Sequence, residues 1–171
     1  NKLEYQSRVY SNLPKFASFI AMSNRVKNDY VNNLNIPADQ IKIIYPGCDV
    51  QDIEESLNRS SEVIRLGIVA NSSINKGGHL FLLAAGLAKM FGAKFKISMI
   101  ATKYKKDIFL QLLINLFRLN SICTIYPKQD DMIEFYNNID CIVLPSRNEA
   151  FGLVVLEGMS FGKVPIVSNT A

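Results

Sequence analysis

Short apolar runs alternate with longer, partly polar segments over the second two-thirds of the chain. Five of these runs are almost continuously apolar: residues 63–70, 95–101, 122–126, 141–144 and 164–167. Continuous apolar runs are typical of parallel strands that are buried on both faces, and the segments between them are long enough for crossover helices. The pattern therefore predicts an α/β fold with a Rossmann-like, doubly wound parallel sheet.

The segments between the runs predict four helices, at residues 78–90, 104–119, 129–137 and 152–161. The second of them carries apolar residues at helical spacing, which we expect to cover the sheet: Ile108, Leu112, Leu113, Leu116 and Leu119. Gly162 and Pro165 follow the fourth segment and form a helix stop signal.

The first fifty residues have a different texture. Residues 16–22 and 41–45 predict strands, and Ser23 is suited to cap a helix that runs through Asn32. The polar, acidic segment 51–62 predicts a linker. We therefore expect residues 1–50 to hold the end of one domain and an interdomain segment, residues 63–171 to form a second domain, and the whole to be a piece of a longer enzyme that is truncated at both ends.

Composition narrows the function classes. Nineteen Lys and Arg against fifteen Asp and Glu give a net charge of +4, which suits a phosphorylated ligand but falls short of a nucleic-acid-binding protein. Cys48, Cys123 and Cys141 are odd in number and form no C-x-x-C pair, and two of them lie in apolar strand-like runs, so we expect reduced, buried thiols in a cytoplasmic setting and no zinc or disulfide. No apolar stretch approaches the ~18 residues that a membrane-spanning helix needs.

Two carboxylates, Glu149 and Glu157, stand eight positions apart directly after the run 141–144. Glu157 lies between Leu156 and Gly158 in a predicted helix with little polar face, and a buried carboxylate without a partner costs several kcal/mol. A ligand rich in hydroxyl groups would supply that partner. Glu149 stands just before the helix, where it either interacts with the helix dipole, worth about 0.5 kcal/mol, or accepts hydrogen bonds from sugar hydroxyls.

Ligands of an open parallel sheet bind beyond the carboxyl ends of its strands, where helix N-termini favour anions. The loop 71–78 offers hydroxyls, amides, Lys76 and two glycines there, which suits a phosphate and equally suits a glycine-rich surface turn. It matches neither a Walker sequence nor a G-x-G-x-x-G fingerprint, which disfavours nucleoside triphosphates and nicotinamide cofactors. In the loop 146–152 and the helix start after it, we expect three amides to face phosphate, those of Phe151, Gly152 and Leu153.

These segments, in this order, resemble the C-terminal nucleotide-sugar-binding domain of retaining GT-B glycosyltransferases of family four, also called group 1. The most specific part is Glu149 to Glu157 with the flanking Pro145-Ser146 and Gly162-Lys-Val-Pro165, which is similar to the E-x7-E motif of that family and its neighbours. Residues 44–49 are similar to the family's I-P-N-G-V-D hinge, and Lys76-Gly77 to its K-G pair. The resemblance implies retaining transfer of a hexose from a nucleoside diphosphate sugar, without a metal or other cofactor.

The resemblance also implies roles for individual residues. Glu149 would contact the donor hexose and Lys76 would neutralise the diphosphate, which makes these two the predicted catalytic residues. Glu157 would accept hydrogen bonds from the ribose hydroxyls. The base would lie against the loop Tyr126, Pro127 and Lys128. The predicted donor-binding residues besides Glu157 are Phe151, Gly152, Leu153, Asn71, Gly77, Lys128 and Arg147.

The sequence departs from the family pattern at one position, and this departure leaves alternative functions to consider. Family members usually carry an Arg five residues before the Lys, whereas Asn71 stands there, so the cationic clamp is weaker unless Arg147 compensates. A non-catalytic nucleotide-sugar-binding or scaffolding domain and a sugar-nucleotide epimerase are the alternatives. We expect this chain alone to bind donor with little or no turnover.

The acceptor, whether glycan, lipid or protein, is not identified by the sequence. A basic cluster at Lys103, Lys105 and Lys106 predicts a solvated helix start or, alternatively, a peripheral contact with an anionic membrane beside a lipid-linked acceptor.

Overall fold

The computed structural model describes residues 18–50, 63–70, 74–102, 104–129 and 131–169. The chain forms two compact units, Asn1–Gly47 and Cys48–Ala171. The predicted linker 51–62 and the predicted donor-binding residue Asn71 lie outside the described residues.

In its described residues, 18–47, the small unit contains four elements: β1 (Phe19–Ala21), α2 (Asn24–Leu34), the 3-10 turn η1 (Ala38–Gln40) and β2 (Ile41–Ile43). The two strands pair in parallel, with the helix between them in sequence. The Ser23 hydroxyl accepts a hydrogen bond from the Val26 amide at 3.2 Å, which confirms the predicted N-cap. The helix ends at Asn35, whose left-handed φ of 54° is typical of a C-cap position.

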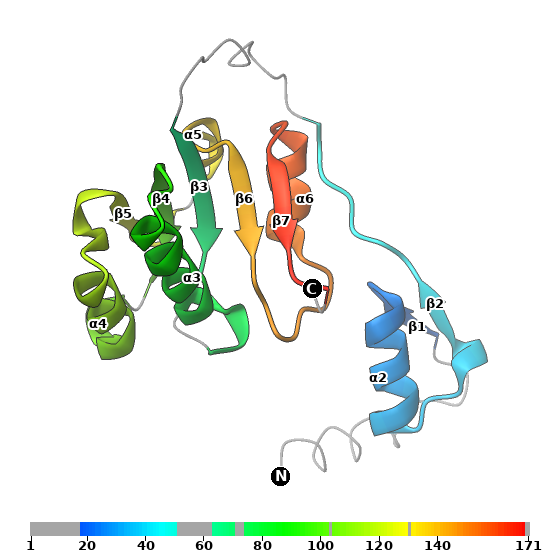
Figure 1. The fold of residues 1–171 in the computed structure, drawn as a ribbon. Coiled ribbons are helices and arrows are strands. Elements are labelled where there is room, and N and C mark those ends of the chain that lie inside the picture. Colours follow the sequence, from blue (N-terminus) through cyan, green and yellow to red (C-terminus); the bar gives the residue numbers. More distant parts are fainter. Residues whose placement is uncertain (1–17, 51–62, 71–73, 103, 130, 170–171) are drawn as a thin grey trace. The chain divides into compact units, whose positions relative to one another are not determined.

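The large unit is built on five parallel strands: β3 (Ile64–Val69), β4 (Phe95–Ile100), β5 (Cys123–Tyr126), β6 (Cys141–Leu144) and β7 (Val164–Val167). Their order across the sheet is β5-β4-β3-β6-β7 (Figure 1). The predicted doubly wound parallel sheet is therefore confirmed. From β3 the chain adds β4 and β5 on one side and then β6 and β7 on the other. The helices that follow β3 and β6, α3 and α6, therefore cover opposite faces of the sheet, and open α/β sheets bind ligands at the carboxyl edge between two such strands.

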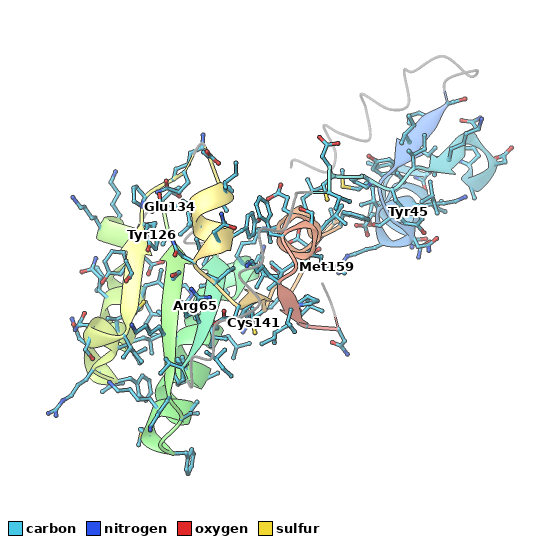
Figure 2. The ribbon with its side chains drawn as sticks, turned by 90° about the horizontal axis from the view of Figure 1, so that it is seen from above. Tyr45, Arg65, Tyr126, Glu134, Cys141 and Met159 are labelled. Atoms are coloured by element: carbon cyan, nitrogen blue, oxygen red, sulfur yellow. The ribbon has the colours of Figure 1, made fainter. Side chains whose placement is uncertain are left out.

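Helices cover both faces of the sheet: α3 (Gly78–Met90) and α4 (Ile108–Leu116) one face, α5 (Ile133–Asn137) and α6 (Leu153–Ser160) the other. Figure 2 shows these two helical layers in a view along the strands. Successive side chains of a strand point to opposite faces of the sheet. Accordingly, Ile68 and Val143 pack with α3 and α4, whereas Ile142 packs with α5 and α6. The described part of this unit also contains three 3-10 turns: η3 (Ile74–Lys76), η4 (Tyr104–Lys106) and η5 (Leu119–Ser121).

Two predicted helices are shorter than expected. The segment 104–119 begins as the 3-10 turn η4, and α4 starts only after Asp107, whose carboxylate accepts from the Leu110 amide at 3.0 Å. An N-cap of this kind fixes where a helix begins. In the segment 129–137, α5 starts at Ile133.

The prediction of which α4 residues cover the sheet was partly wrong. Leu113 and Leu119 are buried as expected, but Ile108, Leu112 and Leu116 are exposed. The side of α4 that packs against the sheet carries Leu110, Leu113 and Ile114. This helix is apolar nearly all round, so periodicity alone does not identify its buried side.

The three cysteines are free thiols. Cys123 and Cys141 are half-buried, and burial raises the pKa of Cys123 to about 12. Cys48 is exposed, so the prediction of buried thiols was wrong for that residue. In the described part of the chain, none of the helices combines the length and the hydropathy that crossing a bilayer would take.

Candidate functional site

The loops that follow β3 and β6 are joined at the carboxyl edge of the sheet. The Arg147 amide donates to the Asn75 carbonyl at 2.8 Å. A Cβ on Gly77 would lie 2.0 Å from the Pro145 carbonyl oxygen, and Gly77 has a φ of +69°. Only glycine fits this position, because any side chain would push the two loops apart.

Lys76 and Glu149 face each other across this junction. The Lys76 amine lies 2.7 Å from Glu149 Oε2, and the buried Ser146 hydroxyl donates to the same oxygen at 3.2 Å. The Glu149 side chain is 13% exposed and the Lys76 side chain 37%. The carboxylate is therefore held in place from inside the protein, while the amine remains accessible to an anion in solvent.

The N-terminus of α6 opens beside this ion pair. Gly152 caps the helix with a φ of +87°, and its carbonyl accepts from the Val155 amide at 2.9 Å. Leu153 begins the eight-residue helix, and Phe151 precedes the cap. The first amides of a helix have no partner within the helix and carry its positive dipole end, so this end of α6 favours an anion.

Glu157 lies one turn into α6 and has a partner that the sequence did not reveal. The Tyr136 hydroxyl is 2.8 Å from Glu157 Oε2 and 3.2 Å from the Val154 carbonyl, and the Tyr136 ring stacks on Phe161 with ring centroids 5.0 Å apart. Burial raises the pKa of Tyr136 well above its usual value, and the hydrogen bond to Glu157 raises it further. The phenol therefore stays protonated and donates to the carboxylate.

Glu157 also lines a cavity of about 380 Å³ between the start of α5 and α6, which we call the Glu157 cavity. Tyr136, Met132 and Ser160 contribute to its walls, together with Asp49 from the segment after Gly47. Glu157 thus lines a largely open hollow, which a ligand can enter from solvent. A carboxylate has several acceptor positions, so Glu157 retains capacity for hydroxyl groups beyond its bond to Tyr136.

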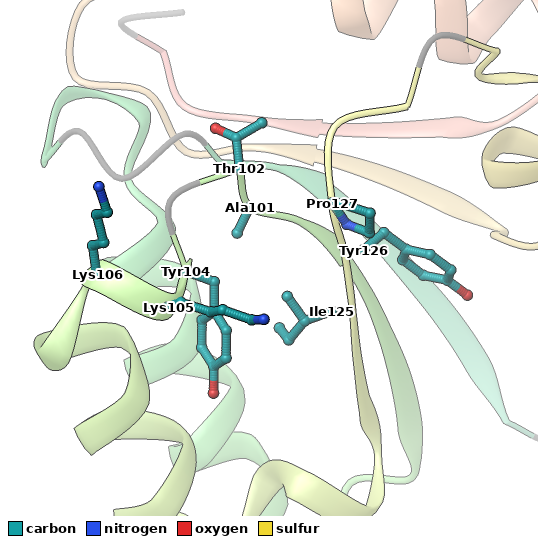
Figure 3. Close-up of a pocket in the computed structure, with 8 residues that line it drawn as sticks. All are labelled: Ala101, Thr102, Tyr104, Lys105, Lys106, Ile125, Tyr126 and Pro127. Carbon is teal, nitrogen blue, oxygen red and sulfur yellow. The ribbon is translucent and has the colours of Figure 1, made fainter.

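A second cavity, of about 700 Å³, lies where β4 and β5 end, and we call it the β4–β5 pocket (Figure 3). Tyr104 and Ile125 project into it on the α4 side, whereas the Tyr126 side chain points the other way (Figure 3). Lys105 and Lys106 contribute cations to its lining. Among the described residues, the lining of this pocket shares no side chain with the Glu157 cavity.

Comparison with known proteins agrees with this geometry. Residues 49–171 match the protein family described as glycosyl transferases group 1. The chain belongs to this family. The match begins at Asp49 and includes both loops of the site and all five strands of the large unit.

Curated relatives of this group 1 chain are also glycosyltransferases. It is 25% identical over 166 residues to a D-inositol 3-phosphate glycosyltransferase of Paenarthrobacter aurescens, a match that covers 90% of the chain and 41% of that protein. An uncharacterized glycosyltransferase of Methanocaldococcus jannaschii is 25% identical, over 88% of the chain and 42% of that protein. The chain therefore spans about two-fifths of the length of these relatives.

Solved structures show the same fold. A glycosyltransferase from Rickettsia africae has a TM-score of 0.77 at 25% identity, over 98% of this chain and 48% of that one. Anabaena HepE in complex with UDP-glucose has a TM-score of 0.80 at 18% identity, over 100% of this chain and 50% of that one.

The structure of this group 1 chain brings some predicted site residues together and leaves others apart. Lys76, Gly77 and Glu149 meet at the junction of the two loops, next to the α6 amides of the predicted phosphate site. The Arg147 backbone belongs to the same junction, with an exposed side chain. Lys128 follows β5, which β4 separates from β3, so it lies further along the edge.

Three residues that contribute to the site were not predicted from the sequence: Asn75, Tyr136 and Ser146. Ser146 and Asn75 bond to the predicted site residues, and their place next to the motif residues was the available signal. Tyr136 had no such signal, because it lies 21 positions from Glu157 in the sequence and on a different helix.

Proposed function

We propose that the carboxyl edge of the large unit binds a nucleoside diphosphate sugar as the donor of a glycosyl transfer. The observation that carries the proposal is the meeting of Lys76 and Glu149, at 2.7 Å, in front of the N-terminus of α6. An accessible amine and helix amides suit a diphosphate, and a fixed carboxylate suits sugar hydroxyls. Family membership and the complex of HepE with UDP-glucose favour UDP-sugars as the first donors to test.

The proposed chemistry follows from charge. Cleavage of the bond between the anomeric carbon and the phosphate oxygen leaves negative charge on the nucleoside diphosphate, which Lys76 and the amides of α6 stabilise. Positive character develops on the sugar, and Glu149 orients the sugar through its hydroxyls. Glu157 accepts hydrogen bonds from the ribose, with Tyr136 as a positioning residue. The base lies towards Tyr126, Pro127 and Lys128.

The activity of the whole protein is part of the same proposal. We infer transfer of a hexose with retention of the anomeric configuration, because the E-x7-E segment is similar to that of retaining group 1 enzymes. The acceptor would meet the donor in the full-length protein. Analysis of the anomeric configuration of the product made by the full-length protein tests retention, and an inverted product would contradict it.

The binding proposal is tested by a thermal-shift screen of UDP-, GDP- and ADP-sugars against the wild type, Glu157→Gln and Lys76→Ala. A donor at ~100 times its dissociation constant should add about 2.7 kcal/mol to the free energy of unfolding of the wild type. Both variants should lose most of this increment. Asp39→Asn and Lys94→Ala are matched controls, since both residues are exposed, one in the small unit and one at the amino edge of the sheet. Absence of a shift with every donor would contradict the proposal.

A further inference from the structure

Two helices carry large apolar side chains on the side that faces away from the sheet. On α3 and directly after it, these are Leu80, Leu83, Leu87, Met90 and Phe91. On α4 they are Ile108, Phe109, Leu112 and Leu116. Exposure reaches 90% at Phe91 and 80% at Ile108. We call these side chains together the α3–α4 face.

The exposed apolar side chains of α3 lie next to those of α4, because the two helices contact each other at both ends. At the start of α3, the His79 ring lies 5.0 Å from the Phe109 ring between centroids. At the other end, the Lys89 amine donates to the Phe117 carbonyl at 3.4 Å. Both helices lie on the same face of the sheet (Figure 1). A contiguous exposed apolar surface of this kind marks an interaction site.

Charge is distributed as unevenly as the apolar residues. Residues 63–129 contain ten Lys and Arg and a single acidic residue, Asp107. The other 104 residues contain nine Lys and Arg and fourteen Asp and Glu. Asp107 is engaged inside the unit, because its carboxylate caps α4 and lies 3.4 Å from the His79 ring nitrogen. In the described residues from 74 to 121, no exposed carboxylate therefore accompanies the face.

Exposed cations stand at both ends of α4. Lys105 and Lys106 precede the helix and line the β4–β5 pocket, and Arg118 follows it. The occupant of the face must therefore be apolar and anionic together. A symmetric dimer through this face would bring the cations of one copy close to the cations of the other, and this repulsion disfavours such a dimer.

We propose that the α3–α4 face binds peripherally to a membrane that contains anionic phospholipid. Apolar side chains of such a surface enter the boundary between headgroups and acyl chains by roughly 5–10 Å, while basic residues contact the lipid phosphates. The face is a flank of the sheet, so a docked membrane leaves the carboxyl edge with Lys76 uncovered. The proposal does not depend on donor binding, because its tests measure vesicle binding in the absence of a donor.

Vesicle sedimentation of the chain tests the proposal. Binding to phosphatidylcholine vesicles that contain phosphatidylglycerol should exceed binding to phosphatidylcholine alone and should fall with added salt. The double variant Lys105→Glu/Lys106→Glu should bind the anionic vesicles about tenfold more weakly or less. Lys42→Glu, an exposed lysine of the small unit, is the matched control and should bind like the wild type. Equal binding by the Lys105→Glu/Lys106→Glu variant and the wild type would overturn the proposal.

A fluorescence experiment tests the apolar part. The chain contains no Trp, so Leu112→Trp on the face and Ile20→Trp in the small unit each give a single reporter at an exposed position. Anionic vesicles should shift the emission of the Leu112→Trp variant to the blue and leave that of the Ile20→Trp variant unchanged. Thermal melts of each variant establish that it is folded. A folded Leu112→Trp variant whose emission does not respond to vesicles, or a face that proves to join two copies in sedimentation velocity, would contradict membrane docking.

Discussion

The Tyr136 hydroxyl donates a hydrogen bond to Glu157 at 2.8 Å and thereby links α5 to α6 beneath the proposed donor site. The Tyr136→Phe variant removes this hydroxyl but keeps the ring that stacks on Phe161. We expect a loss of about 0.5–1.5 kcal/mol in the free energy of unfolding, typical of one buried hydrogen bond. Donor affinity should fall several-fold, because Glu157 loses the group that positions it. Chemical denaturation and donor titration measure the two effects, with Tyr30→Phe, a partly buried tyrosine of the small unit, as control.

The same pair predicts a dependence of stability on pH. Burial, followed by the hydrogen bond to Glu157, raises the pKa of Tyr136 in the folded state, whereas the unfolded value is about 10. The contribution of the neutral phenol is therefore complete below pH ~10 and is lost as the pH rises above that value, where only the unfolded chain ionises. Thermal melts at increasing alkaline pH should show a steeper decline for wild type than for Tyr136→Phe. Parallel declines would contradict this origin.

The close contact between Gly77 and Pro145 leads us to expect that two glycine substitutions differ in their cost to stability. In Gly77→Ala the new Cβ would meet the Pro145 carbonyl oxygen at 2.0 Å, in addition to the strain of a positive φ. Gly92→Ala is the matched control, since its φ is +85° but a Cβ there meets nothing within 4 Å. The control should cost about 1–2 kcal/mol for the left-handed backbone alone. Gly77→Ala should cost more in denaturant melts and should also weaken donor binding; equal costs would show that the two loops separate freely.

Continuous apolar runs made the sheet predictable from the sequence. All five strands lie within one residue or so of the expected ranges. The expected burial on both faces holds best for the inner strands β4 and β6, whereas every residue of the edge strand β7 is exposed, so the apolar run located β7 but misjudged its burial. The helix boundaries were harder to predict. Asp107 caps α4, so this helix begins after Asp107 and the residues before it are not part of the helix. The outward leucines of α4, such as Leu112, were misassigned because a helix that is apolar on all sides has no periodic signal for its buried side.

The site could be predicted only as far as its motif residues. Glu149 and Lys76 were identified by their positions at strand ends and by family resemblance, yet nothing local predicts that residues 73 positions apart form an ion pair. The contact between Tyr136 and Glu157 depends on how α5 packs against α6, which is a property of the folded unit.

Arg65 and Asp140 tie β3 to the start of β6 at the amino edge, away from the proposed site. The Arg65 guanidinium and its amide both donate to the Asp140 carboxylate, and the side-chain hydrogen bond holds the pKa of Asp140 below its usual value. The carboxylate's stabilisation is therefore present above the unfolded pKa of about 3.9 and is lost as the pH falls through the lower folded pKa. Asp140→Asn should lower stability at neutral pH by ~1 kcal/mol or less, because the pair is partly exposed. The difference from wild type should shrink in melts below pH ~4, whereas Asp39→Asn should show none; a difference that persists in acid would contradict this account.

Lys76 has two competing partners in the proposed mechanism, Glu149 in the absence of ligand and the diphosphate when a donor is bound. Glu149→Gln removes the negative charge 2.7 Å from the amine and keeps the shape of the side chain. We expect this variant to bind a nucleoside diphosphate without sugar several-fold more tightly than wild type, because the lysine no longer exchanges one anionic partner for another. Its preference for the sugar-bearing donor should fall at the same time, since the carboxylate that accepts from sugar hydroxyls is gone. Calorimetric titrations with UDP and UDP-glucose separate the two effects. Lys76→Ala should weaken both ligands alike. A Glu149→Gln variant that binds UDP more weakly and keeps its preference for UDP-glucose would show that the carboxylate serves only the stability of the loops.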